Sequence, residues 1–283
     1  MSDATTFSAT APETLEGWYA LHQIFSIDRR ALTSSLDPQD HAARRGGDST
    51  NGAETQHGGW STCVELIGSA ADLMLIHFRP TLDEIGQAQR ALARSPIAGS
   101  LILKYSFLSV TEAGLYHLSA ELAQAATTRG GAVGDAGYRE EAARRVEAER
   151  SNPHVQRRLF PTMPDGMEYV CFYPMSKRRA VGQNWYAQTL EERSRLMQTH
   201  GMTGRRYAGR VIQIITGAIG LDAWEWGVTL FGKDPLDFKK LVTDMRFDEV
   251  SANYADFGDF YVGRIARESD LSAVVETIAY GRP

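Results

Sequence analysis

Seven short runs of apolar, aromatic and β-branched residues constrain the fold of this chain most strongly. Such runs are typical of β-strands, and segments with helical spacing separate several of them. Strands interrupted by helices in both halves of a chain favour an α+β architecture of open character. The runs cover residues 18–27, 73–78, 101–110, a strand that ends at Tyr173, and residues 207–216, 224–231 and 259–263.

Capping patterns mark three helices between these strands. Residues 81–93 begin with T-x-x-E, and Thr189 begins a second capping box whose helix Gly201 should end in the left-handed conformation. Asp234, followed by Pro235, begins a third helix. Its predicted inward face consists of Phe238, Leu241, Val242 and Met245.

Two segments lack this periodicity. Residues 33–59 are polar and contain glycine, which indicates a surface excursion, and their His41 and His57 show no metal-ligand spacing. Residues 121–152 form the expected boundary between the halves. They include alternating charges over 138–150 that predict an exposed helix.

Composition narrows the class of protein. The net charge of -5 and the pI near 5.8 argue against general nucleic-acid binding, which favours a basic surface. Two cysteines, Cys63 and Cys171, exclude a disulfide framework, and no CxxCH attaches a c-type haem. The N-terminus lacks the basic and apolar parts of a secretory signal. No apolar run approaches the ~18 residues that span a bilayer, so we expect a cytoplasmic protein.

The stretch from Glu168 to Gln213 carries the densest chemical signal. Pro174 is expected to place a turn at a strand end or sheet edge, because proline lacks an N–H. If the backbone stays extended, Tyr173, Met175 and Lys177 project from one face, since strand side chains alternate. Two arginines follow, and Arg205 and Arg206 add to the basic cluster. Such a wall suits a large, flat, anionic ligand.

His200 ends the apolar face of the predicted helix after Thr189. Leu190, Leu196, Met197 and His200 recur at roughly helical spacing, which turns the imidazole inward. Two interpretations remain open on spacing alone. One is a core histidine with a backbone partner, and the other is a metal or haem-iron ligand.

Several motifs in this order resemble one enzyme family. They are YPMSKRR, NWY, HG-x-x-GR-x-Y-x-G, QIITG, EWGVTLF and MRFDEVSA. Together they look like the coproheme decarboxylases of the chlorite dismutase-like superfamily, with dense similarity over residues 157–263 and thinner similarity over 17–118. The resemblance implies a dimeric α+β barrel of two ferredoxin-like units per subunit, with the haem site in the C-terminal unit. The units would span 17–120, with an insertion at about 33–60, and 153–283, joined by a variable insertion at 121–152.

The resemblance also implies a reaction. The substrate would be iron-coproporphyrin III, and hydrogen peroxide would drive conversion of two propionates to vinyl groups, giving haem b. His200 would be the axial iron ligand, Tyr173 the catalytic tyrosine that forms a radical, and Lys177 a partner of a propionate. The family further implies a homopentamer, transient contact with the upstream ferrochelatase, and no membrane or nucleic-acid partner.

Other positions match the family less sharply. Arg158 matches a propionate contact, although Arg157 competes because one extra residue separates the motif from Tyr173. Ser251 matches a hydroxyl contact, and Tyr116 is a weaker candidate near the substrate edge. Residues assigned to the substrate or porphyrin edge also include Pro174, Met175, Ser176, Trp185 and Trp224, of which the two tryptophans are equally compatible with core packing.

Gln213 discriminates between activities on this fold. Chlorite dismutases carry a distal arginine at this point, and a fixed guanidinium holds a small oxyanion well. A neutral amide supplies hydrogen bonds without charge, so Gln213 favours the decarboxylase. The alternatives are a chlorite dismutase or general haem peroxidase, and a haem-binding protein without enzymatic activity.

Overall fold

The computed structural model describes residues 9–35 and 58–281. Most of the insertion expected at 33–60, with His41 and His57, lies outside these residues. The strands are β1 (Thr14–Ile27), β2 (Trp60–Leu66), β3 (Leu73–Arg79), β4 (Leu101–Gly114), β5 (Tyr169–Lys177), β6 (Arg179–Ala180), β7 (Gln183–Asn184), β8 (Val211–Gly217), β9 (Trp226–Gly232), β10 (Ala255–Phe257) and β11 (Tyr261–Ile265). The helices are α1 (Arg29–Ser35), α2 (Leu82–Arg94), α3 (Tyr116–Thr128), α4 (Ala136–Arg150), α5 (Pro153–Leu159), α6 (Leu190–Arg205), α7 (Pro235–Arg246), α8 (Glu249–Tyr254) and α9 (Leu271–Tyr280), with 3-10 turns η1 (Ala98–Ser100) and η2 (Trp185–Ala187).

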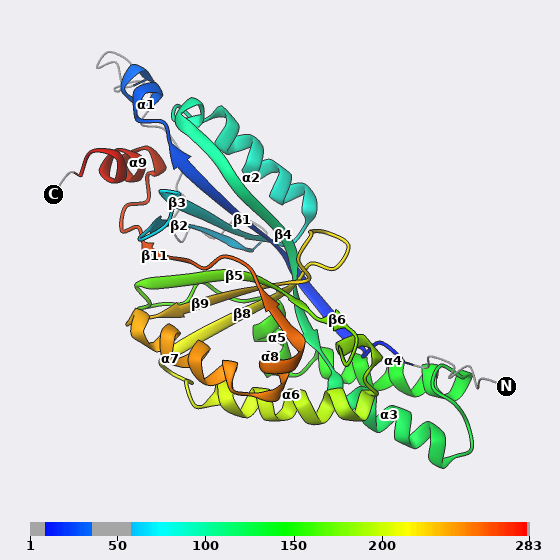
Figure 1. Ribbon diagram of the computed structural model, residues 1–283. Helices are drawn as coiled ribbons and strands as arrows, with labels where there is room; N and C mark the ends of the chain where they lie inside the picture. Colours follow the sequence, from blue (N-terminus) through cyan, green and yellow to red (C-terminus); the bar gives the residue numbers. More distant parts are fainter. Residues whose placement is uncertain (1–8, 36–57, 282–283) are drawn as a thin grey trace.

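The main sheet closes into a barrel (Figure 1). Its order is β5-β11-β2-β3-β1-β4-β8-β9, and β9 pairs again with β5. The first half contributes β2-β3-β1-β4 and the second β11-β5-β9-β8, which is the same ferredoxin-like strand order twice. The α+β prediction with two ferredoxin-like units is therefore confirmed, while the expected open character is wrong. The unit boundaries at 17–120, 121–152 and 153–283 stay a prediction.

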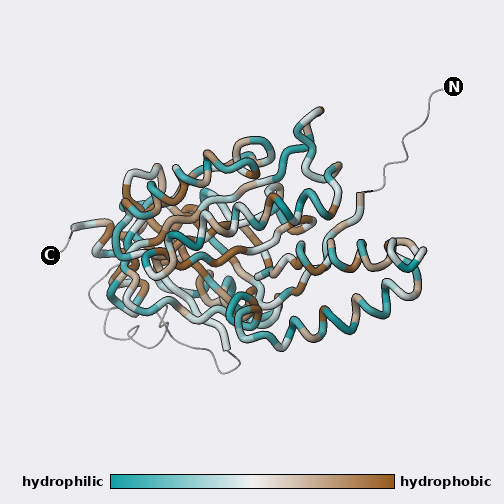
Figure 2. Tube along the Cα trace, turned by 90° about the horizontal axis from the view of Figure 1, so that it is seen from below, coloured by the Kyte–Doolittle hydropathy of each residue, from teal (hydrophilic) through white to brown (hydrophobic). Residues whose placement is uncertain are grey.

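Two pairings join the halves into one sheet. Gly263 of β11 lies opposite Leu66 of β2, and Val110 of β4 lies opposite Gly217 of β8. Closure satisfies backbone groups that would otherwise form exposed sheet edges. Hydrophobic segments accordingly concentrate in the strands, and polar residues lie along the outer faces of the helices (Figure 2).

Aromatic side chains from both halves fill the barrel interior. Phe78 and Phe107 of the first half pack in one buried cluster with Phe172 and Phe231 of the second. Gly227 is required beside them, because a Cβ at this position would lie 2.5 Å from Cε1 of Phe107. The interior also holds His22, which stacks on Phe172 at 4.1 Å between ring centroids.

The N-caps predicted for three helices are confirmed, including Thr189, which accepts from Glu192 N at the start of α6. Thr81 forms the full capping box with Glu84 at the start of α2, and the Asp234 carboxylate accepts from Leu236 N at the start of α7. The exposed helix over 138–150 is present as α4. The preceding helix, α3, was not predicted. It forms because Leu118, Leu122 and Ala126 pack against α4, a contact that local periodicity does not reveal.

Two local predictions around the site are wrong. Gly201 does not end its helix, since α6 continues to Arg205 and Gly201 has no positive φ. Pro174 does not begin a turn, since β5 continues to Lys177. Along one edge of β5 the partner changes from β11, opposite Phe172, to β10, opposite Met175. Pro174 lies at the point where the partner strand changes, so its missing N–H removes no ladder hydrogen bond.

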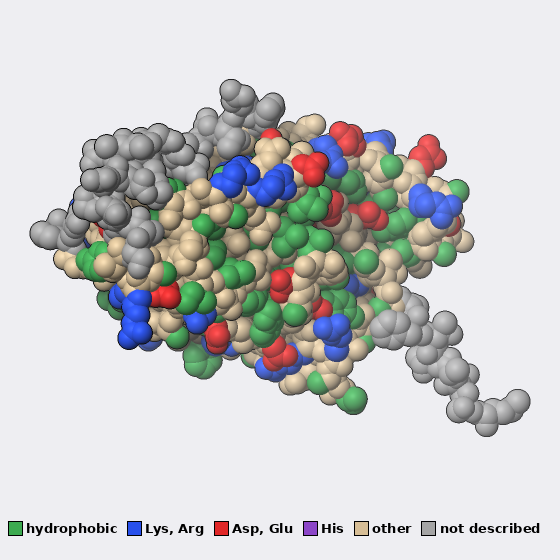
Figure 3. Space-filling model, turned by 90° about the horizontal axis from the view of Figure 1, so that it is seen from above, with side chains coloured by type: hydrophobic (Ala, Val, Ile, Leu, Met, Phe, Trp, Pro, Cys, Tyr) green, Lys and Arg blue, Asp and Glu red, His purple; other side chains and the backbone are tan. Residues whose placement is uncertain are grey.

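Acidic and basic side chains are interspersed over the face shown in Figure 3. Within the described ranges, no helix is long and apolar enough to cross a membrane.

Candidate functional site

The outer face of β5 forms one wall of the site. Tyr173 and Met175 belong to one hydrophobic cluster with residues of β9 and α7, whereas Phe172 faces the barrel interior. This alternation confirms that Tyr173 and Met175 share a face. The Tyr173 ring stacks on Phe260 with centroids 4.4 Å apart. Burial raises the pKa of Tyr173 above its usual value, so the phenol keeps its hydrogen at neutral pH.

His200 of α6 is oriented by a carboxylate. Its Nδ1 lies 2.9 Å from Oδ2 of Asp248, and the two side chains are 28% and 5% exposed. Burial by itself would raise the pKa of Asp248, but the interactions with His200 and the hydrogen bonds from the backbone of Ser251 and Val250 together outweigh it, and the pKa is lowered. Asp248 is therefore the ionised acceptor and Nδ1 the donor, which leaves the lone pair on Nε2. A carboxylate that fixes the tautomer in this way is typical of metal-ligating histidines.

The chain positions Asp248 through the start of α8. The Asp248 carboxylate caps α8 by accepting from Ser251 N at 3.1 Å, and the Ser251 hydroxyl lies 3.5 Å from its Oδ2. The buried Ser251 thus shares a carboxylate with His200. Sequence reasoning missed Asp248, although D-E-V-S has the spacing of an N-cap and could have indicated it.

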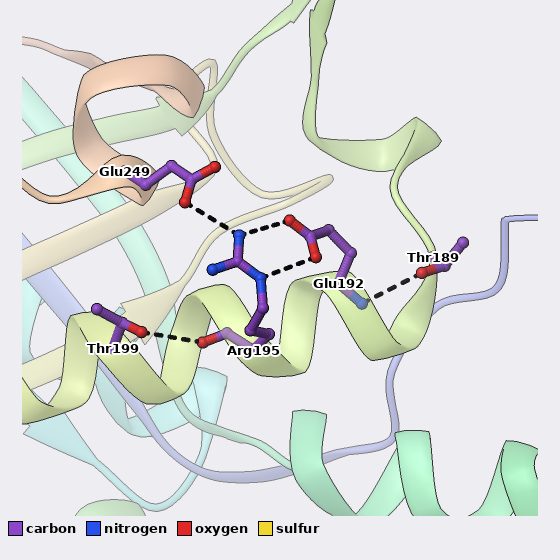
Figure 4. A network of polar contacts seen from close by, with 5 residues as sticks. All are labelled: Thr189, Glu192, Arg195, Thr199 and Glu249. Carbon is purple, nitrogen blue, oxygen red and sulfur yellow. Dashed lines mark hydrogen bonds and ion pairs between the residues drawn. The ribbon is translucent and has the colours of Figure 1, made fainter.

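An ion-pair network fastens α8 to the His200 helix. Arg195 of α6 contacts Glu192, one turn earlier, and Glu249 at the start of α8, with Nη2 2.7 and 3.0 Å from the carboxylate oxygens (Figure 4). Thr189 caps the same helix by accepting from Glu192 N. Because Glu249 follows Asp248 in the chain, the network holds Asp248 beside His200.

Gly204 leaves space between α6 and β8. It lies one helical turn after His200, on the same face of α6. A Cβ at Gly204 would lie 3.2 Å from Met245 Cε and 3.6 Å from Gln213 Nε2. The Gln213 amide therefore lies close to the face of α6 that carries His200, and its distal role stays a prediction.

Lys177 lies at the carboxyl end of β5 in a buried aromatic environment. Only 8% exposed, it places Nζ 4.4 Å from the ring centroid of Trp185, which is 1% exposed. Burial lowers the pKa of Lys177 to about 8, against the opposing effects of Asp248 and Glu225. Tyr116 of α3 packs edge-on against Trp185 at 6.1 Å. The structure thus brings Lys177, Trp185 and Tyr116 together.

Other predicted residues lie elsewhere around β5. Pro174 and Trp224 both pack at Gly258, and Trp224 contacts the barrel-interior cluster, away from Tyr173. The Ser176 hydroxyl accepts from Glu225 N at 3.2 Å. Arg158 lies on α5, where Nη2 is 3.4 Å from the Glu112 carbonyl oxygen.

The basic cluster expected from the sequence is divided in space. Arg178 pairs with Asp256 and Arg179 with Glu225 near the end of β5. Arg206 pairs with Asp244 beyond α6. Two cations instead lie over aromatic rings near β5: Lys177 over Trp185, and Arg246 over Phe257, which packs against Tyr173.

These residues fit an iron porphyrin that carries carboxylates. His200 could hold iron through Nε2, Lys177 could pair with a carboxylate, and Tyr173 could supply an oxidisable phenol. In residues 9–35 and 58–281, no three His, Cys, Asp or Glu side chains are grouped to hold a metal ion.

The chain is similar to known proteins over most of its length. A model of the chlorite dismutase family matches residues 42–266. The coproheme decarboxylase of Staphylococcus saprophyticus is 40% identical over 92% of this chain and 96% of its own length. A haem-binding protein from Thermus thermophilus is 35% identical with a TM-score of 0.70, over 94% of this chain and 98% of that chain. A variant of chlorite dismutase from Candidatus Nitrospira defluvii shares the fold, with a TM-score of 0.62 and 17% identity over 93% of this chain and 96% of that chain.

Proposed function

Because this chain belongs to the chlorite dismutase family, and a relative of nearly equal length is a coproheme decarboxylase, we propose that it converts iron-coproporphyrin III into haem b. The oxidant is hydrogen peroxide, and two propionates become vinyl groups. The observation that carries the proposal is a buried neutral phenol and a buried ammonium four residues apart on one strand, beside a carboxylate-oriented histidine.

The proposed chemistry balances for each propionate. The side chain loses one hydrogen from its β-carbon, one further electron and carbon dioxide, and becomes a vinyl group. Hydrogen peroxide takes up these two electrons and two protons, one from the hydrogen that the propionate loses and one from solvent, and becomes two waters. The iron porphyrin is both the substrate and the redox centre that reacts with peroxide.

Each proposed residue has a separate task. His200 ligates the iron, and the Tyr173 phenoxyl radical removes the hydrogen atom, which requires a fixed distance to the β-carbon. Lys177 pairs with a propionate as a point charge and releases it after reaction. Arg158, Ser251, Pro174, Met175, Ser176, Trp185 and Trp224 are further proposed contacts of the substrate. Gln213 offers hydrogen bonds to bound peroxide but no charge, which favours decarboxylation over chlorite chemistry.

The family also supports proposals about assembly and location. We propose a cytoplasmic homopentamer that receives its substrate in transient contact with the ferrochelatase that inserts the iron. Sedimentation velocity tests the assembly, because a pentamer of 31.3 kDa chains differs clearly from a monomer or dimer.

The function is tested by titrating purified protein with iron-coproporphyrin III, then adding hydrogen peroxide and measuring porphyrin mass. Wild type should lose two carboxyl groups stepwise. Tyr173→Phe should bind the porphyrin nearly as tightly but leave its mass unchanged. Tyr261→Phe is the matched control, because Tyr261 lies on the neighbouring strand and packs toward the barrel interior.

Three outcomes would contradict the proposal. Full activity of Tyr173→Phe would remove the radical role. Tight binding by wild type without mass loss would indicate a haem carrier or a peroxidase, to be tested with chlorite and phenols. Absence of binding would show that the pocket serves another ligand.

A further inference from the structure

Glu225, between β8 and β9, connects the parts of the structure that surround Lys177. It is 7% exposed, and its Oε2 accepts from Lys177 N at 2.7 Å. Its Oε1 lies 3.2 Å from Arg179 Nη2. Its own N–H donates to the Met175 carbonyl, at 3.1 Å, and to the Ser176 hydroxyl. One residue thus binds the last three residues of β5 and the first residue of β6.

The Glu225 carboxylate also pairs with Arg179, at the start of the segment that carries Trp185, and the Lys177 ammonium packs on the Trp185 ring. Arg179 begins the β6–β7 hairpin, which leads directly into η2 with Trp185 and Tyr186. The Arg179 guanidinium also lies over the Tyr186 ring at 5.9 Å, and Tyr186 lies close to Glu225. The hairpin is anchored to the barrel through Glu225, and Lys177 packs on the tryptophan that follows it.

We propose that Glu225 is a positioning residue for Lys177. Glu225 fixes the backbone of Lys177 and the Trp185 ring on which the ammonium packs, and it keeps that ammonium charged in a buried site. This inference rests on the proposed function only for the identity of the anion that Lys177 binds. Burial removes water from the ammonium and disfavours its charged form, and a nearby negative charge opposes this effect. The Glu225 carboxylate is held by the Lys177 backbone N–H and by Arg179. Its negative charge is therefore fixed near the ammonium without a direct ion pair to Lys177 Nζ.

Several groups face Lys177 from the surrounding elements. Asp248 at the start of α8 and Glu225 favour the charged ammonium, and burial opposes it. Trp185 lies under the ammonium and packs against Tyr254 of α8, while Arg179 of β6, paired with Glu225, lies over Tyr186 of η2. Asp248 is already engaged with His200, so Glu225 is the carboxylate whose removal can be tested without disturbing the axial histidine.

The titration of Lys177 can be followed directly, because the chain has five lysines: Lys104, Lys177, Lys233, Lys239 and Lys240. We would record lysine ¹³Cε shifts of the ligand-free full-length protein against pH, with Lys177→Arg to assign the signal. Glu225→Gln should move the Lys177 midpoint to lower pH, reducing its charged fraction at pH 8 by on the order of fivefold. Glu225→Asp should restore much of this effect. Glu168→Gln is the matched control, since it also removes a carboxylate paired with an arginine near β5, at the opposite end of the strand.

A second readout is the ratio of iron-coproporphyrin affinities at pH 6 and pH 8.5. The ratio should increase in Glu225→Gln, because Lys177 stays charged at pH 6 and loses its proton earlier at alkaline pH. If Glu225→Gln does not fold, Arg179→Gln provides the test, since it loosens the same hairpin and should also shift the Lys177 signal. An unchanged Lys177 midpoint in a folded Glu225→Gln protein would overturn the inference. Failure of wild type to decarboxylate would overturn the proposed function but leave the Lys177 titration intact.

Discussion

At the scale of single residues, His200 and Lys177 show opposite ways of holding a functional group. His200 is half-buried and oriented by one ionised carboxylate. Lys177 is almost fully buried, and its Nζ lies over the ring of Trp185. Carboxylates lie nearby, but none of the described contacts is a direct ion pair with Nζ. The first arrangement fixes a lone pair, and the second keeps a charge available for a ligand.

We expect His200→Ala to change the absorption spectrum of bound iron-coproporphyrin, because the axial nitrogen is lost. Asp248→Asn should give a smaller change in the same spectrum, since the amide still reaches Nδ1 but no longer carries charge. Absorbance and resonance Raman spectra measure both effects. A spectrum of His200→Ala identical to that of wild type would show that another residue binds the iron.

Lys177→Met should raise stability while it weakens substrate binding. Burial lowers the pKa of Lys177 to about 8, so the folded state bears the cost of a buried charge below that pH. Between about pH 8 and the unfolded value near 10.4, the unfolded chain binds more protons and wild-type stability rises with pH. The substitution removes this cost, on the order of 1–3 kcal/mol at pH 7, measured by urea unfolding. Lys233→Met on the surface is the control, and equal effects of the two variants would contradict the assignment.

At the scale of elements, α6 carries two glycines with different surroundings. A Cβ added at Gly201 would meet only the end of a flexible side chain, Arg205 Nη1 at 3.8 Å, while one at Gly204 would meet Met245 and Gln213. Glycine in a helix interior costs about 1 kcal/mol relative to alanine. Gly204 therefore lowers the stability of α6 and at the same time places no side chain beside His200.

Paired substitutions test the use of this space. Gly204→Leu should reduce iron-coproporphyrin affinity at least tenfold, because the side chain enters the region between α6 and Gln213. Gly201→Leu should leave affinity unchanged and stabilise the protein by up to about 1 kcal/mol. Titration by absorbance and thermal unfolding measure the two effects. Equal affinities of both variants would place the ligand elsewhere.

At the scale of the whole molecule, the closed barrel makes the two halves one cooperative structure. Inside it, His22 Nε2 of β1 lies 2.9 Å from the Thr229 hydroxyl of β9, which links the halves through the core. His77 is likewise buried, at 2.7 Å from the Ser61 hydroxyl, as expected for a packed strand residue rather than a ligand. Burial lowers the pKa of each histidine to about 3, with repulsion from His77 adding to the effect on His22 and from Arg79 to that on His77.

These histidines predict sensitivity to acid. Between about pH 6.5 and pH 3 the unfolded chain binds protons that the folded protein excludes, so stability falls as the pH falls. His22→Leu should flatten this dependence by about 1.4 kcal/mol per pH unit, measured by urea unfolding at pH 7, 6 and 5. His117→Leu, which changes an exposed histidine of α3, should leave the slope as in wild type. A wild-type slope in His22→Leu would contradict the prediction.

Prediction from the sequence succeeded where the signal was local. The caps at Thr81, Thr189 and Asp234 and the strand alternation at Tyr173 and Met175 depend on neighbours within a few residues. It failed at Pro174 and Gly201, where backbone chemistry suggested an end but tertiary pairing continued the element. It also assigned no role to Glu225, although this residue begins the EWGVTLF motif, because the contacts of Glu225 with β5 and β6 form only in the folded chain.

By itself, the sequence predicted seven strands (β1, β3, β4, β5, β8, β9 and β11) and four helices (α2, α4, α6 and α7), since side-chain type and spacing are properties of the chain, and its motifs named the residues proposed for catalysis. It missed β2, which lies between β11 and β3 in the barrel. Only the tertiary structure decided that the sheet closes, that Asp248 orients His200, and that Glu225 binds the Lys177 segment. The partners in these contacts are 48 residues apart in sequence. Contacts over such separations depend on how whole elements pack, and packing leaves no periodic pattern in the sequence.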